Sequence, residues 1–141
     1  MIKVKNILTK LKNKICYKIA RKKIIKNDSR LKRLEINHEL QLEATKDHIT
    51  HLTTIDADKY ENFILRQSKQ IQKRHIIINK QINLRTKIEK LLNEQEICLN
   101  NTDFELFYKL DSNINQLWLE IFEIMEITPM EEENQINTKN D

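Results

Sequence analysis

The stretch DADKYENFILRQSKQI, residues 56–71, contains a helix-start signal followed by the first turns of an amphipathic pattern. Asp56 and Asp58 are of a residue type that caps helix N-termini, and Glu61 lies three residues after Asp58, where it completes a box-like pair. The two threonines that precede the stretch lower helix propensity because their side chains branch at Cβ. We therefore predict that one helix ends just before this stretch and that a second begins at about residue 57.

Downstream of this point the pattern predicts a helix over about residues 57–99. Apolar residues recur every seven positions, with Arg85 occupying one place in the series. A seven-residue repeat of this length is typical of a helix that supercoils against another helix. The residues expected to form this seam are Ile64, Ile71, Ile78, Leu92 and Leu99.

Upstream, residues 2–53 predict one long helix. Its first part is amphipathic, with apolar residues at the three- and four-residue spacing of one helix face: Val4, Leu8, Leu11, Ile15, Ile19 and Ala20. Residues 30–53 keep a similar rhythm in which only some members are apolar: Leu31, Glu35, His38, Leu42, Thr45, Ile49 and Leu52. A short connection between two long helices makes them antiparallel neighbours.

A third helix is predicted over about residues 103–126, with Thr102 and Glu105 as its capping box. It carries the strongest apolar stripe of the chain, and Pro129 ends it. Residues 127–141 are expected to be a disordered acidic tail. The predicted fold class is all-α: a long antiparallel coiled-coil helical hairpin with an additional C-terminal helix, forming a single helical domain over residues 1–126.

The composition argues against an enzyme. The chain has no glycine, which phosphate-cradling loops, dinucleotide fingerprints and nucleophile elbows all require. His48 and His51 share a helix face but have no third ligand at suitable spacing, so we expect no metal site and no cofactor. Cys16 and Cys98 each fall on an apolar stripe and are expected to be reduced, buried thiols.

Charge is distributed unevenly along the chain. Residues 1–26 carry a charge of +10 with no acidic residue, whereas residues 101–141 carry −8. The basic first helix could contact an acidic protein, nucleic acid or an anionic membrane surface. Contact with protein, either an acidic partner or the acidic third helix of this chain, is the favoured interpretation, because few aromatic residues accompany the lysines and the C-terminal segment has the complementary charge. For the stripe around Trp118 and Phe122, core packing and an exposed docking surface both remain open.

The layout resembles a known group of proteins: a basic first helix, a turn near residue 55, and a long basic helix containing DKYENFILRQSKQIQKRHIIINKQI. It is similar to the FliJ/YscO/InvI family of type III secretion stalk proteins, which are small coiled-coil hairpins. The similarity covers about residues 1–99 and is most local over Tyr60 to Ile76. The separate third helix departs from the simple two-helix pattern of that family.

The resemblance implies a cytoplasmic, non-enzymatic part of a flagellar or injectisome export apparatus, peripheral to the inner membrane. Its protein partners would be a hexameric export ATPase, the export gate and chaperones. The end that faces the ATPase would carry Lys10, Lys14, Arg21 and Lys22, and the opposite end would be residues 53–58.

Two alternatives remain. The run LLNEQEICLNNTDFELFYKLDSNINQLW, residues 91–118, resembles export chaperones of the FlgN/FliT kind, in which the third helix would bind one secreted substrate. The candidate binding residues there are Leu117, Trp118 and Phe122. The other alternative is an adaptor that binds nucleic acid or a membrane surface through residues 1–26. The sequence does not predict the oligomeric state.

Overall fold

The computed structural model describes residues 2–125 and is all-helical over that range, without a β-strand. It consists of α1 (Ile2–Thr53), α2 (Glu61–Asn100) and α3 (Phe104–Met125). The all-α class and the number of helices predicted from the periodicity are thus confirmed. The predicted acidic tail, residues 127–141, and the last residue of the predicted domain lie outside the described residues.

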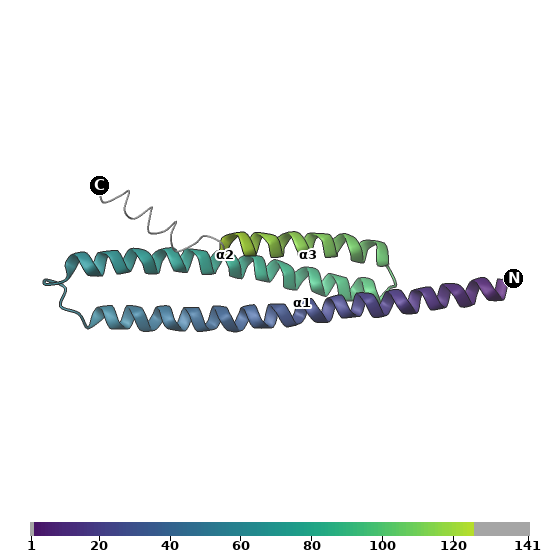
Figure 1. Cartoon of the computed structure of the whole chain (residues 1–141), viewed down its shortest axis with the longest axis horizontal. Coiled ribbons are helices and arrows are strands. Elements are labelled where there is room, and N and C mark those ends of the chain that lie inside the picture. The colour runs from purple at the N-terminus through teal and green to yellow at the C-terminus, as the bar shows by residue number, and fades with distance from the viewer. Residues whose placement is uncertain (1, 126–141) are drawn as a thin grey trace.

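The helices form an elongated molecule (Figure 1). Helices α1 and α2 lie side by side and run in opposite directions, and α3 turns back along α2. Because α3 is much shorter than α2, the molecule has a three-helix part and a two-helix part. The two-helix part ends at the connection between α1 and α2, residues 54–60, which we call the loop end.

At the loop end the predicted helix start is wrong by four residues, because α2 begins at Glu61. The residue at the N-cap position is Tyr60, whose side chain makes no capping hydrogen bond. The carboxylate of Asp56 instead accepts a hydrogen bond from the backbone N–H of Asp58 at 3.1 Å. Such a bond stabilises a local turn, and this competing use of the carboxylate explains why Asp56 does not cap the helix.

The turn between α2 and α3 also differs from the prediction. Asp103, rather than Thr102, caps α3, because its Oδ1 accepts a hydrogen bond from the N–H of Leu106 at 3.2 Å. Thr102 has a positive φ of 54°. A left-handed residue commonly ends a helix and is usually glycine, which this chain lacks. The reversal therefore places a β-branched residue in a conformation that is unfavourable for it.

Buried positions on both long helices are spaced mostly by three, four or seven residues. On α1 they include Ala20, Ile24, Asn27, Leu31, His38, Thr45 and Leu52. On α2 they are Ile71, Ile78, Gln81, Leu84, Ile88, Leu92, Gln95, Cys98 and Leu99. Of the five predicted seam residues, Ile64 is half-buried and the other four are buried, whereas Glu35 and Ile49 of the predicted α1 rhythm are exposed.

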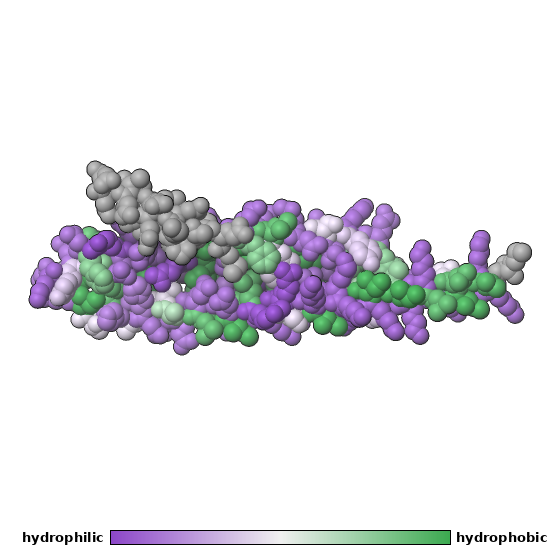
Figure 2. All heavy atoms as spheres, viewed as in Figure 1, coloured by the Kyte–Doolittle hydropathy of each residue, from purple (hydrophilic) through white to green (hydrophobic). Residues whose placement is uncertain are grey.

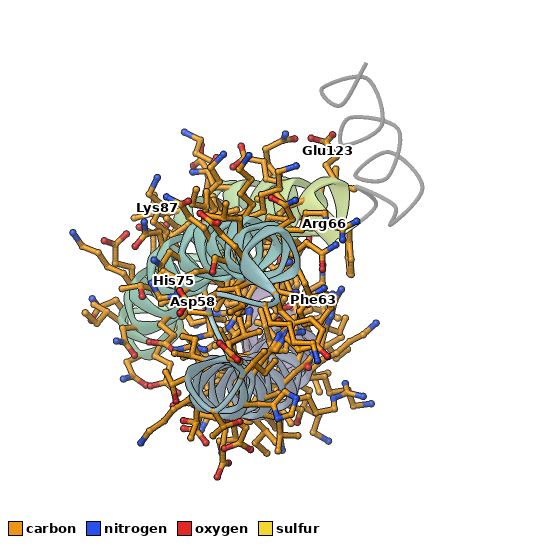
Figure 3. The ribbon with its side chains drawn as sticks, turned by 90° about the vertical axis from the view of Figure 1, so that its left-hand side faces the viewer. Asp58, Phe63, Arg66, His75, Lys87 and Glu123 are labelled. Carbon is orange, nitrogen blue, oxygen red and sulfur yellow. The ribbon has the colours of Figure 1, made fainter. Side chains whose placement is uncertain are left out.

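Most of the buried apolar volume lies in the three-helix part. One cluster joins α1, α2 and α3 through Leu31, Leu84, Ile88, Leu92, Ile114, Trp118 and Ile121. A second cluster lies closer to the turn between α2 and α3 and contains Ala20, Ile24, Cys98, Leu99, Phe107 and Leu110. Viewed along the long axis from the loop end, the charged side chains of Arg66, Lys87 and Glu123 lie on the outside of the molecule (Figure 3).

Candidate functional site

The most unusual surface of the molecule is the first third of α1. The packing of α1 against α2 and α3 begins at Ala20, which is fully buried beside Cys98 and Leu99. The residues before it extend past the end of α2 as a single helix (Figure 1). We call residues 2–19 the overhang; at 1.5 Å per residue it is about 27 Å long.

The overhang carries apolar side chains that nothing in the described part of the chain covers. They appear as a green band flanked by purple, hydrophilic side chains at the right-hand end of the molecule in Figure 2. Leu8 is 60% exposed and Leu11 is 50% exposed, values far above those of core leucines such as Leu31, at 4%. The whole set consists of Val4, Ile7, Leu8, Leu11, Ile15 and Ile19. We call these six residues the overhang stripe.

The overhang stripe does not continue the face that α1 presents to α2. Leu11 lies nine residues before Ala20, and Ile15 lies nine residues before Ile24. Nine residues correspond to about 900°, or two and a half turns, at 100° per residue. The stripe therefore lies on nearly the opposite side of α1 from the residues that pack against α2, so extending α2 would not cover it.

The overhang is exclusively basic: residues 2–19 contain six lysines and no acidic residue. Of the four basic residues named from the resemblance, Lys10 and Lys14 lie on the overhang and are exposed. Arg21 pairs with Glu96 of α2 at 3.2 Å, and both side chains of this pair are about half exposed, so the contact contributes little to stability. Lys22 is exposed.

The second candidate surface, on α3, is largely part of the core. Trp118 is buried and its Nε1–H donates a hydrogen bond to Oδ1 of Asn27 at 3.1 Å. The Arg30 guanidinium lies 4.5 Å from the centre of the Trp118 ring and 5.6 Å from that of Phe122. Leu117 is half-buried, so only Phe122 of the three named α3 residues is substantially exposed.

Phe122 and Arg30 border an open cavity of about 330 Å³ between α1 and α3. Its lining also includes Arg33, Leu34, Asn37, Trp118 and Ile121. A larger open cavity of about 420 Å³ lies near the loop end and is lined by Ile49, Leu52, Thr53, Ile55, Ala57, Ile64, Ser68 and Ile71. Both are open surface features with mainly apolar linings, and neither gathers a set of polar groups aimed at one point.

A buried polar cluster lies where the three-helix part meets the two-helix part. His38 is 1% exposed, and its Nε2 lies 3.0 Å from Oε1 of Gln81, while its Nδ1 lies 2.8 Å from the guanidinium of Arg85. Arg85 can only donate, so the neutral ring with its proton on Nε2 satisfies both contacts. Burial lowers the pKa of His38, and the nearby Arg85 charge lowers this pKa further.

The described residues do not gather a set of metal ligands. Within residues 2–125 no three histidine, cysteine, aspartate or glutamate side chains converge as metal ligands, and His48 and His51 have no third neighbour of this kind. Cys16 and Cys98 are free thiols; Cys16 is half-buried and burial raises the pKa of Cys98. None of the three helices has a stretch of the length and hydropathy needed to span a bilayer.

Comparison with known proteins adds no assignment. No protein-family model, curated protein or solved structure matches this chain significantly.

The periodicity of the sequence predicted an amphipathic first helix, but the set of residues assigned to its apolar face was wrong at two positions. Ile7 belongs to the overhang stripe, and Ala20 belongs to a different face. A comparison of helical phase between residues 4–15 and the later 3–4 rhythm would have revealed the change of face. The contact of His38 with Gln81 and Arg85 could not be read from spacing on one helix, because it depends on the register between two.

Proposed function

We propose that this chain is a non-enzymatic coiled-coil component of a type III protein export apparatus, acting in the cytoplasm as a stalk. In this proposal α1 and α2 form an antiparallel coiled-coil hairpin, and the overhang docks on the export ATPase. The hairpin then couples the ATPase to the export gate or to chaperones.

The observation that carries the proposal is the overhang. Six lysines without an acidic neighbour and an uncovered apolar stripe occur on a helix that extends past the rest of the molecule. A stable fold does not need such a projection, since the packed part of α1 begins only at Ala20. Large exposed apolar patches mark interaction sites, and basic clusters select acidic partners.

The coiled-coil part of the proposal is supported by the spacing of buried residues. On α2, Ile78, Gln81, Arg85, Ile88, Leu92, Gln95 and Leu99 alternate by three and four residues, which is the a/d pattern of a heptad repeat, with Arg85 half-buried and the others buried. The buried residues of α1 are spaced by four, three and four from Ala20 to Leu31 and by seven from Leu31 to Leu52. Polar residues within such a seam are typical devices for specifying one register.

The test is the ATPase activity of a purified type III export ATPase in the presence of this chain. We expect the chain to raise the rate of hydrolysis and the double variant Lys10→Gln/Lys14→Gln to lose most of this effect. The variant Lys80→Gln/Lys87→Gln removes the same charge from exposed positions on α2 and serves as the control. No stimulation by the unaltered chain, or an equal loss in both variants, would refute the stalk proposal.

A second candidate, an export chaperone, is favoured by one observation: Phe122 remains 43% exposed beside the cavity that Arg30 and Arg33 border. A chaperone would co-purify with one export substrate and lose it in Phe122→Ala. Substitution of Trp118 would not be informative, because Trp118 is part of the core. Co-purification that depends on Phe122 and is unaffected by Lys10→Gln/Lys14→Gln would favour the chaperone over the stalk.

A further inference from the structure

The spacing of the overhang stripe specifies the kind of surface that can cover it. Val4, Leu8, Leu11 and Ile15 are separated by four, three and four residues. This alternation gives a narrow apolar line along about three turns of helix, which is the shape that a second helix covers in a coiled coil. In heptad notation Leu8 and Ile15 are at a, and Val4 and Leu11 are at d.

The same notation places lysines beside the line. Lys5 and Lys12 are at e positions and Lys14 is at a g position. Charges at e and g face the corresponding positions of the partner helix and determine which partner is accepted. With lysine at these three places, the complementary helix needs glutamate or aspartate at its own flanks.

Other occupants fit less well. Two overhangs from two copies of this chain would bring together two helices that each carry six lysines, with no acidic residue in residues 2–26 to pair with them. Helix α3 is already used, because its own apolar residues face α1 and α2. The apolar face of a helix that lies on a lipid surface typically carries Trp, Phe or Leu, and residues 2–19 contain two leucines but no Trp or Phe to anchor the helix in the interface.

We infer that the overhang stripe is the binding site for an acidic amphipathic helix of a partner protein. That helix pairs with Val4, Leu8, Leu11 and Ile15 as the second strand of a coiled coil, and its acidic flanks meet Lys5, Lys12 and Lys14. The inference rests on the proposed function in one respect: both assign partner binding to the overhang, and the inference adds the chemistry of the helix that binds there. It does not depend on the identity of the partner.

The test uses the full chain and a synthetic probe, a fluorescent heptad peptide with leucine at a and d and glutamate at e and g. Fluorescence anisotropy measures its binding, and circular dichroism measures the helix formed. We expect saturable binding that Leu8→Ser/Leu11→Ser weakens at least about tenfold, because both leucines lose most of their buried apolar area. The control Ile36→Ser/Leu40→Ser changes two α1 residues of similar exposure, 56% and 61%, and should bind as the unaltered chain does.

A charge-reversed variant makes the test more specific. Lys12→Glu/Lys14→Glu should lose the acidic peptide and gain affinity for the matching peptide with lysine at e and g. All of these substitutions lie at exposed positions, so the fold of the three-helix part should remain intact, which circular dichroism of the free variants checks.

Three results would overturn the inference. Absence of binding to the acidic peptide would do so directly. Equal affinity for polyglutamate, unaffected by Leu8→Ser/Leu11→Ser, would show that only charge is recognised. Helix-dependent binding to phosphatidylglycerol vesicles but not to the peptide would assign the stripe to a lipid surface. If instead the peptide binds as expected but no export ATPase responds to the chain, the stalk proposal fails while this inference stands.

Discussion

Residues 2–19 and residues 20–37 belong to one continuous helix, yet they differ in what surrounds them. The second segment is packed against α2 and α3 through Ala20, Ile24 and Leu31, whereas the stripe of the first segment is exposed. Both segments are amphipathic, so amphipathicity alone does not identify a core face. The two segments differ in the direction that their apolar faces point and in whether another helix lies against that face. Residues 20–37 therefore stabilise the fold, whereas residues 2–19 are free to bind.

The largest expected contrast is between two leucines of α1. Leu31→Ala should lower the free energy of unfolding by about 2–5 kcal/mol, because it leaves a cavity in the core cluster around Ile88 and Trp118. Leu11→Ala makes the same chemical change on the overhang stripe and should alter this free energy by less than about 0.5 kcal/mol. Urea denaturation followed by circular dichroism measures both. Similar losses in the two variants would mean that the overhang is part of the folded core.

The next effect concerns pH and the buried cluster around His38. Because burial holds the pKa of His38 below its value in the unfolded chain, the unfolded state binds the proton more readily. The stability that neutral His38 contributes is therefore fully present above its unfolded pKa of about 6.5. As the pH falls below about 6.5 this contribution is lost, and the free energy of unfolding decreases by at most about 1.4 kcal/mol per pH unit.

His38→Gln should remove this part of the pH dependence between pH 8 and pH 5, even if it lowers stability at pH 8. His75→Gln changes an exposed histidine of α2 and should leave the pH dependence unaltered. Denaturation midpoints at several pH values provide the comparison. An unchanged slope in His38→Gln would show that a different group is responsible.

A smaller effect is expected at the turn that directs α3 away from the overhang. Thr102 has a φ of 54°, which costs an L-residue other than glycine about 1–2 kcal/mol. Thr102→Gly should relieve this cost and raise the free energy of unfolding by about 1 kcal/mol after the extra flexibility of glycine in the unfolded chain is included. The control Thr86→Gly, within α2, should instead lower stability by about 0.5 kcal/mol. Destabilisation by Thr102→Gly would contradict the left-handed geometry of the turn.

The all-α class and the extent of the first helix were predictable because they depend on local periodicity and breaking residues. The predicted bounds of α1, residues 2–53, agree with the structure, since two threonines and the turn around Asp56 end it. The start of α2 and the capping residue of α3 were predicted less well. Side-chain oxygens compete for nearby backbone N–H groups, and the sequence does not show whether Asp56 or Asp103 will cap a helix or a turn.

The candidate site was only partly predictable. The basic character of Lys10 and Lys14 is evident from the sequence, and their exposure follows from their charge. That Leu8 and Leu11 are uncovered while Trp118 is covered depends on where α2 ends and α3 turns back. Their burial depends on how the three helices pack together, and the periodicity of a single helix does not predict that packing.

The most direct test of the central claim is amide hydrogen exchange along α1 in the full chain. Single unsupported helices of this length are marginally stable, whereas packed helices open only at a cost approaching global unfolding. We predict a step in protection near Ala20 of at least about a hundredfold, with residues 3–19 exchanging fast and residues 20–37 slowly. We further predict that the acidic heptad peptide slows exchange in the overhang alone. Uniform protection along α1 in the free chain would contradict the account.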